Sequence, residues 1–270
     1  MSRWASRSKW DHSFVAGLFV IGGLYVVLIA AMLAADLMYT TPADVQYAFN
    51  SPEIRYAIWL SLVSCAMTAI LSVWVAVPLG YVLSRFSFPC KGVVDALVDI
   101  PVVLPPLVIG LSLLILFQTF AGRAFEHFVF PVTYLIPSVI LAQFSVSCAF
   151  AVRTMRVAFD QMTPRQEQVA LTLGCSRSQA FWLVVLPEAR RGIISAGTIA
   201  WARALGEFGP ILVFASATRM RTEVLSTTVW LELNVGDLAA AVAVSILMVL
   251  VAALVLALTR LLGLRGAGVM

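Results

Sequence analysis

Six long stretches with almost no charged residues limit this chain to folds that suit a lipid bilayer. Five of the six contain no Asp, Glu, Lys or Arg, and the remaining one is interrupted only by Arg203 and Glu207. Each is longer than the roughly 18 residues that mark a candidate membrane-spanning helix. The sequence therefore predicts spans near residues 13–35, 56–84, 100–122, 132–152, 192–215 and 238–259.

The overall composition points the same way. Hydrophobic residues make up 61% of the chain and charged residues 12%, and the mean hydropathy is +0.96, whereas soluble domains have about 45–50% apolar and about 25% charged residues. Inside hydrocarbon every backbone amide must be hydrogen-bonded within its own segment, so apolar runs of this length are helices rather than barrel strands. We therefore expect an all-α membrane protein with six transmembrane helices, organised as a single domain over residues 1–270 and surrounded by lipid.

Basic residues are distributed unevenly over the loops between these spans. With the N-terminus inside, thirteen Lys and Arg residues lie on the inner side and four on the outer side, while Arg203 lies within a span. Such an excess marks the cytoplasmic side, so the sequence predicts a multi-pass protein with both termini cytoplasmic. The first apolar run exceeds the 7 to 15 residues of a signal-peptide core, and we expect it to be retained as an anchor.

The cysteines and histidines do not form a metal-binding pattern. Four cysteines, at positions 65, 90, 148 and 175, lack CxxC spacing, and the sequence has two histidines, His12 and His127. A zinc or haem centre needs more ligands at closer spacing, so we predict neither a metal site nor a disulfide framework. The net charge of +4 comes from basic residues beside apolar runs, where anionic lipid attracts them, and no nucleic-acid partner is expected.

The largest polar element lies between the fourth and fifth predicted spans, at residues 155–189. Residues 163–166 (TPRQ) fit a capping box that begins a helix, and Gly174 supplies a left-handed stop. Residues 176–179 (SRSQ) form a second capping box, and Pro187 predicts the end of the second helix. This pattern predicts a cytoplasmic helix-turn-helix. Its apolar residues, available for burial under the spans or for docking to another protein, are Phe181, Trp182 and Leu183.

Part of this loop resembles a known motif. Residues 167–174 (EQVALTLG), followed nine residues later by residues 184–187 (VVLP), resemble the Glu-Ala-Ala loop of binding-protein-dependent ABC importer permeases. Residues 101–106 (PVVLPP) and 202–209 (ARALGEFG) are similar to the same superfamily, particularly to its molybdate, tungstate and sulfate branch.

The resemblance implies a type I permease in the cytoplasmic (inner) membrane of a prokaryote. The implied partners are a second permease copy in a homodimer, two cytoplasmic ABC ATPases and an extracytoplasmic solute-binding protein. The implied substrate is molybdate or tungstate, with sulfate or another small solute as the alternative. The loop residues implied in coupling to the ATPase are Glu167, Ala170, Gly174, Leu186 and Pro187.

The sequence also bears on where ATP is hydrolysed. It contains no Gly-x-x-x-x-Gly-Lys-Ser/Thr phosphate loop. We therefore expect no cofactor in this chain, with ATP and Mg bound by the partner ATPase, and we expect a transport subunit rather than an enzyme.

Small residues and a pair of opposite charges mark the fifth predicted span as a candidate pathway or gate. Gly206 and Gly209 surround Glu207, and Arg203 lies four residues before Glu207 on the same helical face. A charge at the bilayer centre costs about 2.5–3.5 kcal/mol on insertion scales, so either the two charges form a structural ion pair or Arg203 serves the anion in a wet cavity. The three prolines of residues 101–106 fit either a segment that faces the pathway or the first turn of a plain helix.

Two other classes of protein have apolar helices of this kind. An ion-coupled secondary transporter usually has an inverted repeat with interrupted helices in both halves, whereas here the helix breakers fall in the third and fifth spans and no repeat is visible. An intramembrane hydrolase needs a nucleophile and a base, or two metal-binding carboxylates, at membrane depth. Both classes work without an ATPase, so co-purification of an ATP-hydrolysing chain distinguishes them from the permease.

Overall fold

All regular elements in the described part of the chain are helices. The computed structural model describes residues 2–41, 46 and 48–265, and no strand occurs among them. Residues 1, 42–45, 47 and 266–270, which include both ends of the predicted 1–270 domain, lie outside the described residues. The all-α prediction is confirmed for the part described.

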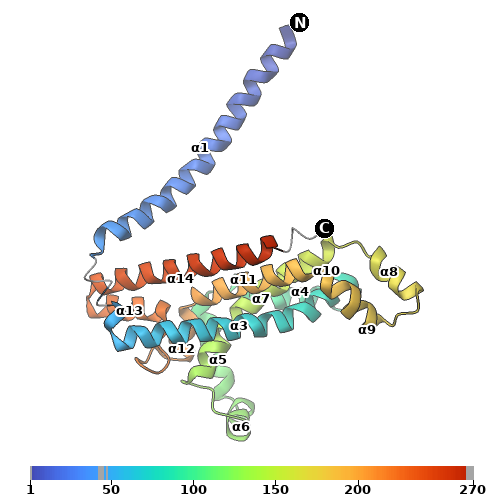
Figure 1. The fold of residues 1–270 in the computed structure, drawn as a ribbon. Coiled ribbons are helices and arrows are strands. Elements are labelled where there is room, and N and C mark those ends of the chain that lie inside the picture. Colours follow the sequence, from blue (N-terminus) through green and yellow to red (C-terminus); the bar gives the residue numbers. More distant parts are fainter. Residues whose placement is uncertain (1, 42–45, 47, 266–270) are drawn as a thin grey trace.

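Four long helices and a series of shorter ones make up the molecule (Figure 1). The long ones are α1 (Ser2–Tyr39), α3 (Pro52–Arg85), α7 (Ile136–Gln161) and α14 (Leu238–Arg265). Between α3 and α7 lie α4 (Lys91–Val103), α5 (Pro106–Gln118) and α6 (Phe120–Phe128). Between α7 and α14 lie α8 (Arg165–Thr172), α9 (Arg177–Ala180), a π-helical segment (Phe181–Val185), α10 (Leu186–Glu188), α11 (Arg190–Leu205), α12 (Gly209–Phe214) and α13 (Leu225–Val235).

Four of the described helices are long and apolar enough to cross a membrane. They are Phe14–Tyr39 of α1, all of α3, all of α7, and Leu238–Ala257 of α14. The count rises to five if the bent pair α4 and α5 is one span. The structure therefore supports an integral membrane protein with several spans, and it differs from the predicted pattern at the third and fifth spans.

The third predicted span is not one straight helix. The chain bends by 114° between α4 and α5, and Leu104 and Pro105 at the corner have extended backbone conformations. Proline lacks an amide donor, and it forces the residue before it away from helical angles. Two consecutive prolines, Pro105 and Pro106, therefore break the helix, and α5 then ends at Gln118, short of the predicted residue 122.

The fifth predicted span, residues 192–215, is also divided. Helix α11 ends at Leu205, and α12 begins at Gly209 after a three-residue break. A 16-residue helix is about 24 Å long, which is less than the roughly 30 Å of the hydrocarbon core. Glu207 therefore lies in a break between helices rather than in the middle of a continuous one.

The core of the molecule forms where α3, α7, α11 and α14 pack lengthwise (Figure 1). Thr68 and Ser84 of α3 bond to Gln143 and Asp160 of α7, so these two helices run in the same direction. In contrast, Gly192 at the start of α11 lies beside Ala158 near the end of α7, and the far end of α11 meets Gln143. Helix α11 therefore runs antiparallel to both.

Small side chains allow α3 and α7 to approach closely. The buried face of α3 is spaced at three to four residues along the helix and is formed largely by Ser61, Ser64, Cys65, Thr68, Ser72, Ala76 and Gly80. A Cβ atom at Gly80 would lie 2.9 Å from the Met155 Cβ of α7. Such close backbone packing is typical of helices in membranes, where small residues line the contact.

Helix α1 stands apart from this core. None of its most apolar segment is buried within the chain, and Figure 1 shows it extending away from the bundle. Its apolar residues lie on all sides, as expected of a helix that is surrounded by lipid or by other membrane proteins.

Candidate functional site

The loop between α7 and α11 contains the first group of predicted site residues. Gly174 directly follows Leu173, the C-cap of α8, and its φ of 91° is the left-handed conformation predicted for this position. The Gly174 amide donates to the Leu171 carbonyl and the Cys175 amide donates to the Ala170 carbonyl, each at 3.1 Å. This is the Schellman arrangement, which satisfies the last carbonyls of a helix. Glycine is needed here because an L side chain is strained at this φ.

Of the two capping boxes predicted for this loop, one is absent and one is present. The predicted capping box at residues 163–166 is absent, because Pro164 takes the N-cap position and has no side chain that accepts a hydrogen bond. The second box is present: the Gln179 amide donates to Ser176 Oγ at 3.2 Å, and the Ser176 amide donates to Gln179 Oε1 at 2.8 Å. Pro187 lies one residue before the end of α10 at Glu188, so the second helix ends close to the predicted position. The chain passes through a π-helical turn, Phe181–Val185, directly into α10, and a wider π turn accommodates the missing proline donor.

Glu167 faces the helical bundle rather than the solvent. Tyr81 Oη of α3 donates to Glu167 Oε1 at 2.5 Å, and Arg85 Nε lies 3.7 Å from Glu167 Oε2. The Tyr81 ring in turn packs against Phe181, with ring centroids 4.8 Å apart, and against Phe159 of α7, at 5.6 Å. Glu167 therefore anchors α8 to the end of α3.

The outer side of the same loop is apolar. Its exposed large side chains are Val169, Leu173, Trp182 and Leu183. Phe181 packs inward, and Ala170 is buried, whereas Gly174 and Pro187 are exposed and Leu186 is partly buried. The three apolar residues predicted for burial or docking thus divide, with Phe181 partly buried and Trp182 and Leu183 exposed. An exposed apolar surface at the end of a bundle is typical of a protein interface.

Arg203 and Glu207 form an ion pair, one of the two alternatives predicted for them. Arg203 Nη2 lies 2.7 Å from Glu207 Oε1, and the exposed fractions of the two side chains are 32% and 1%. The guanidinium also lies over the Phe150 ring of α7, 5.5 Å from its centroid. One charge of the pair is therefore fully buried, and the other keeps a surface open to its surroundings.

The two helix breaks meet at this place. A Cβ atom at Gly110 of α5 would lie 2.7 Å from Pro210 Cα of α12, and one at Gly209 would lie 3.0 Å from the Leu107 backbone nitrogen. The backbones of α5 and α12 are therefore in direct contact, and we call this contact the helix junction. Gly206 differs, because the nearest atom to a Cβ at that position is 3.9 Å away.

Polar residues that the sequence did not single out hold the broken end of α11. Gln143 Nε2 of α7 donates to the Ala204 carbonyl at 3.3 Å, and its Oε1 accepts from Thr68 Oγ1 at 3.2 Å. Ser226 Oγ of α13 donates to the Glu207 carbonyl at 2.6 Å. The signal for Gln143 was an amide within an apolar span, but its partner could not be identified without the fold.

The described residues contain no group of three or more His, Cys, Asp or Glu side chains placed to hold a metal ion. Together with several apolar helices long enough to span a membrane, the geometry defines an all-helical, polytopic membrane protein in which described ion pairs join neighbouring helices.

Comparison with known proteins identifies the family. Residues 76–265 match the family of binding-protein-dependent transport system inner membrane components, and the chain belongs to it. It is therefore a multi-pass inner membrane protein and a permease subunit, a transport component rather than an enzyme, as the sequence predicted.

Several relatives are similar over most of the chain. The sulfate transport system permease protein CysT of Escherichia coli is 31% identical over 224 residues, which are 82% of this chain and 81% of that protein. The molybdate/tungstate transport system permease protein WtpB of Thermococcus kodakarensis is 34% identical over 201 residues, 73% and 77% of the two chains. The molybdenum transport system permease protein ModB of Mycobacterium tuberculosis is 36% identical over 208 residues, 76% and 78% of the two chains.

The fold is shared with a solved transporter. A chain in the crystal structure of a bacterial alginate ABC transporter, in complex with an alginate pentasaccharide-bound periplasmic protein, matches with a TM-score of 0.76 at 15% identity and covers 98% of both chains. At that identity the likeness concerns the fold alone.

Proposed function

We propose that this chain is the permease subunit of an ATP-driven importer that moves a small oxyanion, most simply molybdate or tungstate, across the membrane by alternating access. Relatives at 34% and 36% identity carry molybdate, tungstate or molybdenum in their names. A relative named for sulfate is 31% identical, so sulfate is the alternative substrate.

The partial exposure of the Arg203 side chain is the observation that supports an anionic substrate. Its guanidinium lies between the Phe150 ring and the buried Glu207 carboxylate, and about a third of the side chain is exposed. A guanidinium presents several N–H donors in a plane, which suits the oxygens of a tetrahedral anion. Glu207, as its buried partner, limits how tightly an anion is held. Gly206 and Gly209 complete the proposed gate, since both lie at the break between α11 and α12.

Helix directions support six crossings within a single transmembrane domain over 1–270. Helices α3 and α7 run in the same direction, so residues 86–135 must carry the chain back across the bundle, and the bent pair α4 and α5 is the apolar segment available for that crossing. Helix α11 runs the opposite way to α7, and with α12 it provides the fifth crossing. With α1 and α14, the chain crosses six times, which places both termini on one side, and the excess of basic residues makes that side the cytoplasm.

The loop at residues 155–189 is the proposed coupling loop. Two cytoplasmic ABC ATPases dock there, with ATP and Mg bound by those subunits and no cofactor in this chain. Its exposed apolar side chains supply the docking surface, and Gly174 sets the direction of α8. Ala170, Leu186 and Pro187 shape the two short helices, while Glu167 ties the loop to α3. Coupling by Glu167 therefore works through the permease itself rather than by reaching the ATPase.

The remaining partners are a second copy of this chain, in a homodimer, and an extracytoplasmic solute-binding protein. Helix α1, which has little contact with its own bundle, is available to a neighbouring subunit or to lipid. No nucleic acid is involved.

The test is transport by the reconstituted complex. The permease is co-expressed with its ATPase and binding protein and placed in proteoliposomes, and uptake of molybdate, tungstate and sulfate is measured with ATP on the side of the ATPase. ATP-dependent uptake of molybdate or tungstate, with sulfate at least tenfold less effective, supports the proposal. Preferred uptake of sulfate would establish the alternative, and uptake driven by an ion gradient without ATP would refute the importer.

A further inference from the structure

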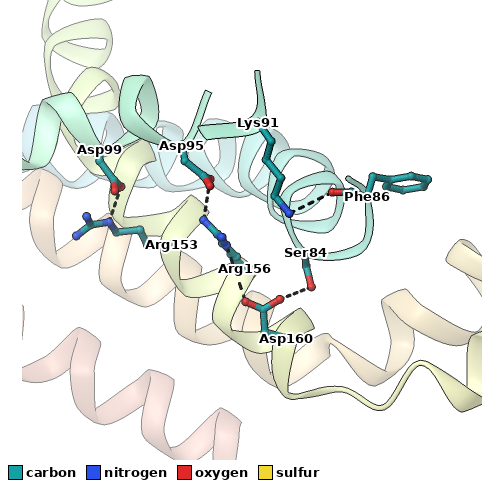
Figure 2. A network of polar contacts seen from close by, with 8 residues as sticks. All are labelled: Ser84, Phe86, Lys91, Asp95, Asp99, Arg153, Arg156 and Asp160. Atoms are coloured by element: carbon teal, nitrogen blue, oxygen red, sulfur yellow. Dashed lines mark hydrogen bonds and ion pairs between the residues drawn. The ribbon is translucent and has the colours of Figure 1, made fainter. Parts of the chain in front are cut away.

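Two ion pairs connect α4 to α7 at the end of the bundle that carries the coupling loop (Figure 2). Asp99 Oδ1 lies 2.6 Å from Arg153 Nε, and Asp95 Oδ1 lies 2.7 Å from Arg156 Nη1. The two aspartates are four residues apart and lie on one face of α4. The two arginines are three residues apart and lie on one face of α7. We call these four residues the ladder.

The ladder contributes little to the stability of the fold. The Arg153 and Asp99 side chains are 49% and 42% exposed, and those of Arg156 and Asp95 are 37% and 26% exposed. Solvent-exposed ion pairs contribute about 0–1 kcal/mol. Apolar contacts already hold α4 on the bundle, because Val94 and Val98 pack against the core cluster that contains Phe159. The charges therefore determine where α4 sits along α7 more than whether α4 is bound.

On one side the ladder leads to the coupling loop. Asp160, in the last turn of α7, accepts from Ser84 Oγ of α3 at 2.5 Å, and its other oxygen lies 3.9 Å from Arg156 Nε, as Figure 2 shows. Two residues further, the Met162 carbonyl accepts from Arg85 Nη2 at 3.0 Å, and Arg85 also faces Glu167 of α8. The end of α7, the end of α3 and the start of α8 thus form one polar network.

On the other side the ladder leads to the corner between α4 and α5. Leu104 and Pro105 each precede a proline, and Pro105 and Pro106 have ring-restricted φ angles, so the corner has few accessible backbone conformations. The Leu104 amide also donates to the Ile100 carbonyl at 2.9 Å, and the Pro105 carbonyl accepts from the Val108 amide at 2.9 Å. A displacement of α4 is therefore transmitted to α5 instead of being absorbed at the corner.

Helix α5 meets α12 at the helix junction. Because Gly110 and Gly209 bring the two backbones into contact, a shift of α5 moves α12. Helix α12 follows the break that contains Glu207, the buried partner of Arg203. Every step from the loop to the proposed gate is thus either a direct contact between described residues or a short stretch of continuous backbone.

We propose that Asp95, Asp99, Arg153 and Arg156 are positioning residues that carry movement of the coupling loop through α4 and α5 to the gate. This inference rests on the proposed function and deepens it by naming the connection between its two sites. The acidic pair on α4 and the basic pair on α7 act as a rigid link, so α4 follows the end of α7 throughout the transport cycle.

The first experiment breaks the ladder. The variant Asp95→Asn with Asp99→Asn is compared with Lys91→Gln, a matched control that removes a charge from the same helix; Lys91 Nζ donates to the Phe86 carbonyl rather than to α7. In the reconstituted complex we measure how far substrate-bound binding protein stimulates ATP hydrolysis, and how much substrate enters per ATP. We expect the double variant to assemble and to lose about tenfold in substrate moved per ATP, within the usual range of coupling free energies, while the control stays near the unmodified complex.

The second experiment restores the link. Exchanging the charges by Asp99→Arg with Arg153→Asp rebuilds one pair in reverse, and a short bifunctional thiol reagent joins Asp99→Cys to Arg153→Cys in a chain whose exposed Cys90 has been replaced. Both should recover substrate moved per ATP relative to the broken ladder, because a rigid link remains. Undiminished coupling in the Asn double variant, or a cross-linked complex that assembles and hydrolyses ATP without transport, would overturn the proposal. If the unmodified complex shows no stimulation by the binding protein, it is the proposed function that fails.

Discussion

Replacing Gly110 by alanine tests whether backbone contact between α5 and α12 holds the helix junction. The added Cβ would lie 2.7 Å from Pro210 Cα and 2.9 Å from the Pro210 carbonyl oxygen. Both atoms belong to the backbone, so no side chain can turn aside to make room. Carbon atoms pack at about 3.5–4.0 Å, and the two helices must therefore separate by about 1 Å.

The magnitude of the effect follows from that displacement. Overpacking of this kind costs about 1–3 kcal/mol. Each kcal/mol lowers the unfolding midpoint by about 2–4 °C in chains of 150–250 residues, so the expected decrease is about 2–12 °C. Transport should fall as well, because α12 is displaced next to Arg203 and Glu207.

The assay is thermal unfolding of the purified permease in detergent, followed by uptake in proteoliposomes. Gly206→Ala is the matched control, because its Cβ has no neighbour closer than 3.9 Å and its φ of −83° suits alanine. We expect the control to unfold within about 2 °C of the unmodified protein, since alanine is strained only at positions of positive φ. An unchanged midpoint and normal uptake in Gly110→Ala would refute the close contact, and an equal decrease of the unfolding midpoint in Gly206→Ala would show that the effect is not steric.

Three further predictions concern the charge pair, the loop and the topology. Removing one partner of a buried ion pair costs about 3–5 kcal/mol, so if Arg203 and Glu207 form only a structural pair, the double variant Arg203→Met with Glu207→Met should restore the expression and much of the transport lost in either single variant. If Arg203 serves the anion, the double variant should fold without transporting. Full uptake by a stable Arg203→Met protein would contradict both roles. Gly174→Val should lose the stimulation of ATP hydrolysis by binding protein, because a β-branched residue in the left-handed conformation costs about 1–2 kcal/mol although the site has space for the side chain. Gly174→Asn should retain most of this stimulation. Normal stimulation in the valine variant would argue against a coupling role. In a chain lacking Cys90, a cysteine at exposed Met220 should react with an impermeant thiol reagent added outside intact cells. A cysteine at exposed Arg165 should not react. Labelling at position 165 from outside would refute the six-span topology.

Local signals in the sequence predicted those elements whose cause is also local. Gly174 was identified as a helix stop because a left-handed residue is required there, and the second capping box needed only Ser176 and Gln179. A spacing of four residues placed Arg203 and Glu207 on one helical face, and the ion pair was one of the two alternatives left open for them. The capping box at 163–166 failed because Pro164 competed for the same position.

Other features depended on contacts between segments far apart in the chain. The sequence showed helix breakers in the spans at 100–122 and 192–215, but hydropathy measures composition and not the direction of the chain. Hydropathy does not reveal how sharply Pro105 and Pro106 turn the chain. It also does not reveal that Gln143 donates to the Ala204 carbonyl at the end of α11. In the sequence, Glu167 is an acidic residue in a polar loop without an evident partner. Only the fold shows that its carboxylate lies against Tyr81 and Arg85.

The sequence by itself determined the membrane environment, the helical class, the helix stop at Gly174 and the helix start at Ser176, because hydrophobic length, turn chemistry and capping act over a few residues. The tertiary structure decided which helix breaks meet and which charges pair between helices. Gly110 lies a hundred residues from Pro210, and Asp99 lies more than fifty from Arg153. Such contacts arise when parallel and antiparallel helices pack through small residues, and their partners are selected by the three-dimensional fit of the helices rather than by any spacing along the chain.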